Sequence, residues 1–414
     1  MKLNRLVLFG MILALFFEAD PFSVRIFGVR IRAVQVLACA GAFVVLAGVL
    51  GKRWPIQKTH LGPFLWGYLG VNALAILNSQ DPRRGIKITI LLFSLILIFF
   101  VMEYLLLKKE IFVRAFHLFL WAGMAEMAYG LYQVAAGLIN LIFKAHLPIG
   151  ASGLAQVNYI GAPWGRPYGT FAEADWFAAV ALFYALLFLA LSFSSRPNRR
   201  FYRAGLVLSL AVLFLGFVRG AWGGFLFGLI LFIVFGKRIR GLKFKPAMII
   251  KPVAILVLAV AILIFVFSPI RQVFQKRFFP APGQERYYTM DIRWVAVKES
   301  VRSFLESPLI GHGPGTVGRS MSFNPSLVTT LLEDTGVLGL IFFGLFLFSF
   351  FRMGVKHIPR LNEHDQPASF GLFLATAGLF ASYLITCGLW MPFTWAFLGF
   401  SVASLRNAAH SRAS

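Results

Sequence analysis

Three arginines in this chain have surroundings that favour phosphate binding. Arg219 lies between glycines in GFVRGAWGG, at a tight turn between two apolar segments, where a charge is costly and marks a functional candidate. Arg293 lies two residues after Asp291, and Arg166 begins RPYGTFAEADWFA. A guanidinium group holds a phosphate through two parallel hydrogen bonds, which predicts an anion site. The alternatives are a snorkelling interfacial Arg219 and an ordinary ion pair of Arg293 with Asp291 or Glu299.

Three other side chains are candidates for proton transfer, and a further acid stands alone in a predicted span. Glu173 and Asp175 lie in the first turn of a predicted transmembrane helix, where a carboxylate complements the helix dipole. The functional alternative to this capping role is that one of them acts as a general base or orients an acceptor hydroxyl. His312 lies between glycines in GHGPG, and we expect it to be exposed and mobile, either as a base or as an incidental loop residue. Glu126 is a lone acid in a predicted span, and we expect it to pair with an arginine or to line the cavity.

The sequence contains no pattern for a metal or a nucleotide. It has no HExxH, Walker loop, DxD motif or paired cysteines, and its two cysteines, Cys39 and Cys387, lie inside apolar segments. We therefore expect no cofactor and no metal ion. The net charge of +24 is spread over many short loops rather than gathered in one basic domain, so nucleic acid is not an expected partner.

Membrane-spanning helices are the elements that must position these side chains. Hydrophobic residues make up 59% of the chain and charged residues only 14%, against about 25% charged residues in soluble domains. We predict an all-α, polytopic integral membrane protein, with a single transmembrane domain over residues 1–414 and about twelve spans. The predicted spans are Leu3–Phe17, Ala33–Leu50, Leu61–Leu77, Ile86–Leu107, Val113–Ala135, Trp176–Phe193, Ala204–Val218, Ala221–Phe235, Met248–Phe267, Val328–Phe351, Phe370–Cys387 and Phe393–Leu405.

The distribution of lysine and arginine predicts the orientation of this bundle. With a cytoplasmic amino terminus, the basic clusters at 199–203 and 237–245 fall inside, and both termini are cytoplasmic. The segment Pro269–Leu327, between the ninth and tenth spans, is then a large extracytoplasmic loop. Its apolar residues from Ile292 to Leu305 recur at helical spacing, which predicts a helix beside the bilayer. Cations on this face suit a phosphate-bearing ligand, and the alternative is contact with anionic lipid headgroups.

Four motifs occur here in the order found in the O-antigen ligase and O-antigen polymerase superfamily of bacterial envelopes. They are RPYGTFAEADWFA, FVRGAWGG, DIRWVAVKES with ESPLIGHGPGT, and LLEDTGVLGLIFF, and they resemble the family from about Arg166 to Phe343. The resemblance implies a GT-C type glycosyltransferase at the outer face of the bacterial cytoplasmic membrane. It also implies a glycan donor on undecaprenyl diphosphate, a glycan or lipid acceptor, and no metal or nucleotide. By motif, Arg219 and Arg293 resemble the pair that binds the diphosphate. This agrees with the anion site predicted above. We assign Arg166 to the same site.

One departure from the family pattern affects the predicted acceptor. Ligases of the family typically carry a His-Asn pair before the span that opens with Glu-x-x-Gly-x-x-Gly, whereas this chain has Phe323-Asn324. The missing histidine resembles an acceptor-activating base, so we favour a polymerase over a lipid A-core ligase. Glu173 is then the preferred base and His312 the second candidate, while Asn324 and Asp175 are candidates for the acceptor side.

Two other classes of protein share this layout. A transporter or flippase for lipid-linked sugars would also have many spans and outer arginines, but it would show an internal repeat, which this sequence lacks. A non-catalytic member of a polysaccharide-assembly complex is the other alternative, since the family histidine is missing. Membrane lipids and polysaccharide-assembly proteins are therefore the expected partners besides the substrates.

Overall fold

The computed structural model describes residues 2–17, 24–26, 29–52, 59–148, 166–195, 197–242, 290–315 and 326–410, with the single positions 262, 271 and 275. Helices dominate these residues, and two short strands, β1 (Val24–Ile26) and β2 (Val29–Ile31), form an antiparallel hairpin. The helices are α1 (Lys2–Ala14), α2 (Ala33–Leu50), α3 (Gly62–Ala75), α4 (Pro82–Leu105), α5 (Lys109–Phe143), α6 (Ala174–Ser192), α7 (Arg199–Leu215), α8 (Arg219–Gly236), α11 (Met290–Glu306), α12 (Leu327–His357), α13 (Gln366–Tyr383) and α14 (Pro392–His410), with 3₁₀ turns η1 (Ile76–Asn78) and η2 (Ile358–Arg360).

The helical membrane fold predicted from composition is confirmed apart from the small hairpin. Within the described residues, six helices are long and apolar enough to cross a membrane: α2, α4, α5, α6, α8 and α12. A helix also lies at every other predicted span that falls within the described residues, but these helices are shorter or less apolar. The predicted span Met248–Phe267 lies almost wholly outside the described residues, as does much of the segment Pro269–Leu327, so the count of twelve spans stays a prediction.

Helix α5 is much longer than the sequence indicated. The predicted span Val113–Ala135 covers only its middle, because the helix has 35 residues from Lys109 to Phe143. Its last turns contain Asn140 between apolar side chains, and Asn140 exchanges hydrogen bonds with the backbone of Leu147 just beyond the helix. Hydropathy alone placed the end too early because it follows polarity and not the continuity of the backbone hydrogen bonds.

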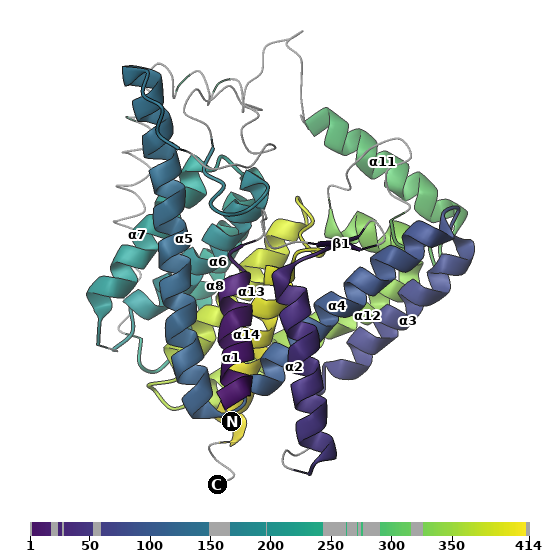
Figure 1. Ribbon diagram of the computed structural model, residues 1–414, viewed down its shortest axis with the longest axis horizontal. Coiled ribbons are helices and arrows are strands. Elements are labelled where there is room, and N and C mark those ends of the chain that lie inside the picture. The colour runs from purple at the N-terminus through teal and green to yellow at the C-terminus, as the bar shows by residue number, and fades with distance from the viewer. Residues whose placement is uncertain are drawn as a thin grey trace.

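Helices α6 and α13 form the centre of the bundle, where they pack against each other and against α8 (Figure 1). The backbones of α8 and α13 approach so closely that a Cβ atom on Gly224 would lie 2.3 Å from the Gly378 carbonyl oxygen. Small residues allow this approach in membranes, where dispersion contacts and hydrogen bonds hold helices together. Three hydroxyl pairs join α13 to α14: Ser369 with Ser404, Thr376 with Ser401, and Tyr383 with Thr394.

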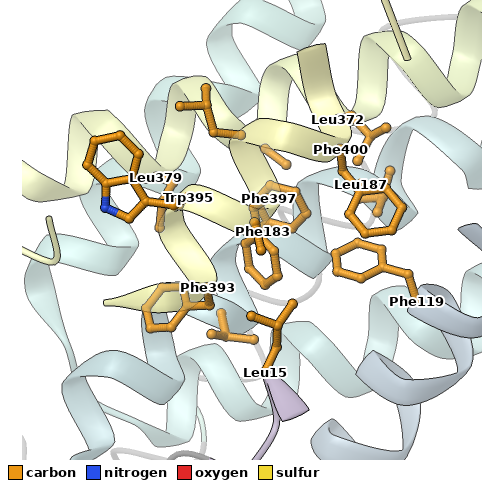
Figure 2. Packing of buried hydrophobic residues seen from close by; sticks show 14 of the residues in the cluster. Leu15, Phe119, Phe183, Leu187, Leu372, Leu379, Phe393, Trp395, Phe397 and Phe400 are labelled. Carbon is orange, nitrogen blue, oxygen red and sulfur yellow. The ribbon is translucent and has the colours of Figure 1, made fainter. Parts of the chain in front are cut away.

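Aromatic rings fill the space between α5, α6 and α14 (Figure 2). The Phe183 and Phe397 ring centroids lie 4.1 Å apart, and the Phe119 and Phe400 centroids lie 4.5 Å apart. These are offset or tilted arrangements of the kind that aromatic rings prefer. The aromatic cluster fixes α6 and α14 rigidly beneath the polar side chains at one end of the bundle.

The two ends of the bundle differ in the elements that they carry. Helix α1 begins and α14 ends at one end, which we call the terminal end (Figure 1). Helix α11 lies across the opposite end, which we call the α11 end, and it runs crosswise to α3, α4 and α12 in this view. Because the helices alternate in direction, α6 and α8 begin and α7 and α13 end at the α11 end.

Candidate functional site

Arg166 links the beginning of α6 to the end of α7 at the α11 end of the bundle. Its Nη2 atom donates to Asp175 Oδ1 at 2.5 Å, and its Nε atom donates to the Gly216 carbonyl at 2.7 Å. Asp175 lies in the first turn of α6, and Gly216 is the residue that directly follows α7 and caps it. The Arg166 side chain is largely buried, so the arginine is fixed by a carboxylate on one side and a helix-terminal carbonyl on the other.

Arg219 and Arg293 come from different helices and converge on the connection between α13 and α14. Arg293, near the start of α11, donates from Nη1 to the Ile385 carbonyl at 2.6 Å and to Thr386 Oγ1 at 3.3 Å. Arg219 is the first residue of α8, and the next residue, Gly220, packs on the same connection, since a Cβ there would lie 3.1 Å from Thr386 Oγ1. The tight turn before Arg219 places Phe217 at a φ of 51°, a backbone conformation that a bulky residue rarely adopts.

Electrostatic interactions connect Arg293 to Asp175 and Arg219. Burial lowers the pKa of the Arg293 guanidinium, the Asp175 carboxylate opposes this effect, and the Arg219 charge lowers the pKa further. Arg293 therefore lies within electrostatic range of both an opposite and a like charge. We call Arg166, Asp175, Arg219 and Arg293 the arginine cluster. The structure thus brings together all three arginines that the sequence predicted to bind phosphate.

The arrangement favours a bound anion. The half-buried Arg293 lies within electrostatic range of the like charge of Arg219, and a phosphate bound by both guanidinium groups would offset that repulsion. The first turns of α6 and α8 lie at the same place, and the amino-terminal ends of helices carry partial positive charge. The cluster can therefore stabilise negative charge that develops on a leaving group.

Helix α5 holds the loop that carries Arg166. Gln133 Oε1 accepts hydrogen bonds from the Tyr168 and Gly169 amides, and its Nε2 atom donates to the Gly169 carbonyl at 2.9 Å. Earlier on the same helix, Glu126 Oε1 accepts a hydrogen bond from the Thr170 amide at 2.7 Å. Gly169 has a φ of 58°, and a Cβ there would lie 2.0 Å from Glu126 Oε1, so no other residue fits. The sequence singled out Glu126 but predicted an arginine or a cavity as its neighbour; in the structure its carboxylate instead accepts hydrogen bonds from the amide and the hydroxyl of Thr170.

Glu173 lies beside the arginine cluster. It is the residue before α6, two positions before Asp175, and it is half-buried. Its carbonyl accepts from the Phe177 amide, but its side chain makes no capping hydrogen bond. Glu173 nevertheless lies at the amino-terminal end of α6, where its carboxylate complements the helix dipole without a capping hydrogen bond. A role as base stays a prediction.

His312 is largely buried, contrary to the sequence prediction that it is exposed. Only 14% of its side chain is exposed, its amide donates to the Glu333 carbonyl, and its ring Nε2 lies 2.8 Å from the Ser303 carbonyl oxygen. Because a carbonyl only accepts, Nε2 carries the proton. Ser303 is ten residues after Arg293, a rise of about 15 Å along α11. His312 therefore lies at the end of α11 away from Arg293.

The glycine-rich loop around His312 completes a break in α12. Gly336 has non-helical angles, with φ of 61° and ψ of −159°. A continuous helix would pair the Val337 and Leu338 amides with the Glu333 and Asp334 carbonyls. Instead, the two amides donate to the carbonyls of Pro308 and Leu309. The Glu333 and Asp334 carbonyls accept from the amides of His312 and Gly313. The loop therefore replaces a missing helical turn, which loop composition alone did not reveal.

Two buried acids at this break are features that the sequence prediction passed over. Glu333 and Asp334 are 7% and 3% exposed, and their Oε2 and Oδ1 atoms accept no hydrogen bond from the described residues. Adjacent acids inside an apolar span, followed by glycine, are the signal that could have found them. Asn324 and Phe323 lie outside the described residues, as does the Asp291 side chain. Within the described part of the chain, no three His, Cys, Asp or Glu side chains gather as a metal site would require.

Residues 204–344 match the family model described as O-antigen ligase. The matched stretch runs from α7 through α8 and α11 into α12 beyond its break, and it includes Arg219 and Arg293. Arg166 and Asp175 precede it. No curated protein matches the chain. The resemblance found in the motifs is therefore confirmed over this segment, which contains two of the three clustered arginines.

Proposed function

Since residues 204–344 carry the sequence pattern of the O-antigen ligase family, we propose that this protein is a membrane glycosyltransferase that moves a glycan from undecaprenyl diphosphate to an acceptor. The observation that carries the proposal is the arginine cluster, in which Arg219 and Arg293 from separate helices lie close together beside the Arg166–Asp175 pair. Two such guanidinium groups match the two phosphates of a diphosphate.

In the proposed reaction, the acceptor hydroxyl oxygen attacks the anomeric carbon of the donor glycan. The bond between that carbon and the phosphate oxygen breaks, and undecaprenyl diphosphate leaves with the electron pair. Arg219 and Arg293 stabilise the negative charge on the leaving oxygen, which is the largest single contribution in many such sites. Asp175 holds Arg166 in place, so we assign it to the donor side; Asn324 is retained as a proposed acceptor-side residue.

The acceptor hydroxyl must lose a proton, and we propose that Glu173 is the base that accepts this proton. Its carboxylate belongs to the same short segment as Asp175, next to the site of bond breaking, whereas His312 lies at the other end of α11. With Phe323 at the position of the family histidine, we favour a polymerase that extends a lipid-linked glycan. The cluster lies at the α11 end, away from the terminal end, which supports an outward-facing site in the bacterial cytoplasmic membrane with both termini inside.

The test is a transfer assay with the protein in vesicles and an undecaprenyl diphosphate-linked glycan as donor. Glu173→Gln keeps the size and hydrogen bonding of the side chain but removes its basicity, so transfer should fall by about 10²–10⁴-fold while donor binding persists. His312→Ala is the matched control and should leave most activity. Normal transfer by Glu173→Gln together with a large loss in His312→Ala would move the base to His312. No transfer by the unmutated protein from any donor of its host would favour the non-catalytic assembly role.

A further inference from the structure

Helix α11 exposes a strip of large apolar side chains. Trp294, Val301 and Leu305 are 59%, 42% and 69% exposed, and at about 100° per residue they fall within roughly 40° of one another around the helix axis. Leu309, just after the helix, is 67% exposed. We call these four residues the apolar strip. In water this much exposed apolar surface on one edge would be costly, so something apolar covers it.

Two cations follow the apolar strip around the helix. Lys298 and Arg302 are exposed and lie about 40° and 80° from Trp294 on the helical wheel. The Lys298 ammonium lies 5.6 Å from the centre of the Trp294 ring, a cation–π distance. We call Lys298 and Arg302 the basic strip. Both point away from the arginine cluster, because Arg293 lies with the buried Ala296 and Ser300 on the opposite side.

Two acids complete the exposed surface. Glu299 and Glu306 are exposed at about 140° and 120° from Trp294, beyond the basic strip. Around α11, the order is therefore apolar, then basic, then acidic, and finally buried. Val295, 42% exposed between the basic and acidic strips, is the exception. This order matches the layers met on leaving a bilayer: acyl chains, anionic headgroups and water.

We propose that α11 docks through its apolar and basic strips on the surface of an anionic phospholipid bilayer. The helix lies across the end of a bundle of membrane-spanning helices, so a bilayer surface is present at that level (Figure 1). Trp and Lys or Arg together are the side chains that anchor helices at this depth. A protein partner of this shape would not require cations between the apolar edge and the acids. The cations of α11 thus divide into Arg293, which faces the site, and Lys298 with Arg302, which face lipid.

The test measures depth directly and does not rest on glycosyl transfer. In a background with Cys39→Ser and Cys387→Ser, an environment-sensitive fluorophore is attached at Trp294→Cys or Leu305→Cys, with Glu299→Cys and Glu306→Cys as matched controls on the same helix. The proteins are placed in vesicles of phosphatidylcholine, alone or mixed with phosphatidylglycerol, and spin-labelled lipids serve as quenchers. Labels at 294 and 305 should be quenched, and labels at 299 and 306 should remain in water.

The charge requirement has its own readout. Lys298→Gln and Arg302→Gln, with the label at 305, should each lower the ratio of docked to undocked helix about fivefold in the vesicles with phosphatidylglycerol. In phosphatidylcholine alone the same changes should have little effect. Equal quenching at all four label positions would overturn the docking proposal. Docking that is indifferent to phosphatidylglycerol and to both cations would overturn the anionic lipid as its partner.

Discussion

The two ends of the bundle differ in how their charged side chains are arranged. At the terminal end, cations lie against carboxylates: Arg406 of α14 bonds to the buried Glu103 of α4, and Lys109 lies 2.9 Å from Asp365, which His364 also contacts. At the α11 end, Arg293 lies near the like charge of Arg219 as well as near Asp175. Paired charges hold helices in place and need nothing further. Like charges in one half-buried place would be stabilised by an anion, which is why we propose the α11 end as the ligand-binding end.

The largest expected effect is on stability and comes from breaking the buried pair at the terminal end. Glu103 is 3% exposed, so Arg406→Gln leaves a buried carboxylate without its cation, at a cost of about 3–5 kcal/mol. Thermal unfolding in detergent should show the loss. The double replacement Glu103→Leu with Arg406→Leu should recover much of it, because no buried charge then remains. Transfer activity per folded molecule should not change, and a fall in that activity would break the division between the two ends.

At the α11 end, conservative replacement should affect function more than stability. Arg219→Lys and Arg293→Lys keep the charge but lose the planar fork that holds a phosphate by two bonds. Each should lower transfer about ten- to a hundredfold, equivalent to roughly 1.5–3 kcal/mol. The measurement is donor-dependent transfer at equal expression. Wild-type transfer by both variants would remove the diphosphate from the arginine cluster.

Exchanging Gln133 for Glu and Glu126 for Gln on α5 should have unequal effects on stability and on donor binding. Gln133 both accepts from the Gly169 amide and donates to the Gly169 carbonyl, so Gln133→Glu loses the donor in a buried place, at about 1–3 kcal/mol. Glu126 only accepts from Thr170, so Glu126→Gln should be nearly neutral. We expect Gln133→Glu to raise the KM for donor by displacing Arg166. Equal effects of the two exchanges would show that these contacts do not position the arginine.

The smallest effect is expected at the exposed ion pair of the terminal end. Burial alone would raise the pKa of Asp365, but hydrogen bonds from Lys109 and His364 outweigh it, and the pKa is lowered. The stabilisation is therefore full above the pKa of the unfolded chain and is lost as pH falls through the lowered value. Asp365→Asn should cost less than about 1 kcal/mol at neutral pH, because Lys109 is 58% exposed. The difference from wild type should vanish in acid, and a difference that persists there would contradict the pairing.

Sequence reasoning succeeded where a residue was unusual for its surroundings. Arg166, Arg219 and Arg293 stood out because an arginine beside apolar segments needs a reason, and the structure brings them together. It failed where a property depends on a distant segment. His312 looked mobile between glycines, yet Gly311 fits against α12 and Gly313 fits against the end of α3. Gln133 looked like an ordinary helix residue, and only its spacing of seven from Glu126, which places both on one face of α5, could have signalled a shared partner.

The break in α12 has a consequence for how the protein is made. Until residues 307–315 occupy the gap, the Val337 and Leu338 amides and the Glu333 and Asp334 carbonyls have no partners. Hydrocarbon offers none, at several kcal/mol for each group. The second half of α12 therefore cannot settle in the bilayer independently of a loop synthesised just before it. Insertion of a tag between Ser307 and Gly315 should leave the protein degraded during membrane assembly rather than present and inactive.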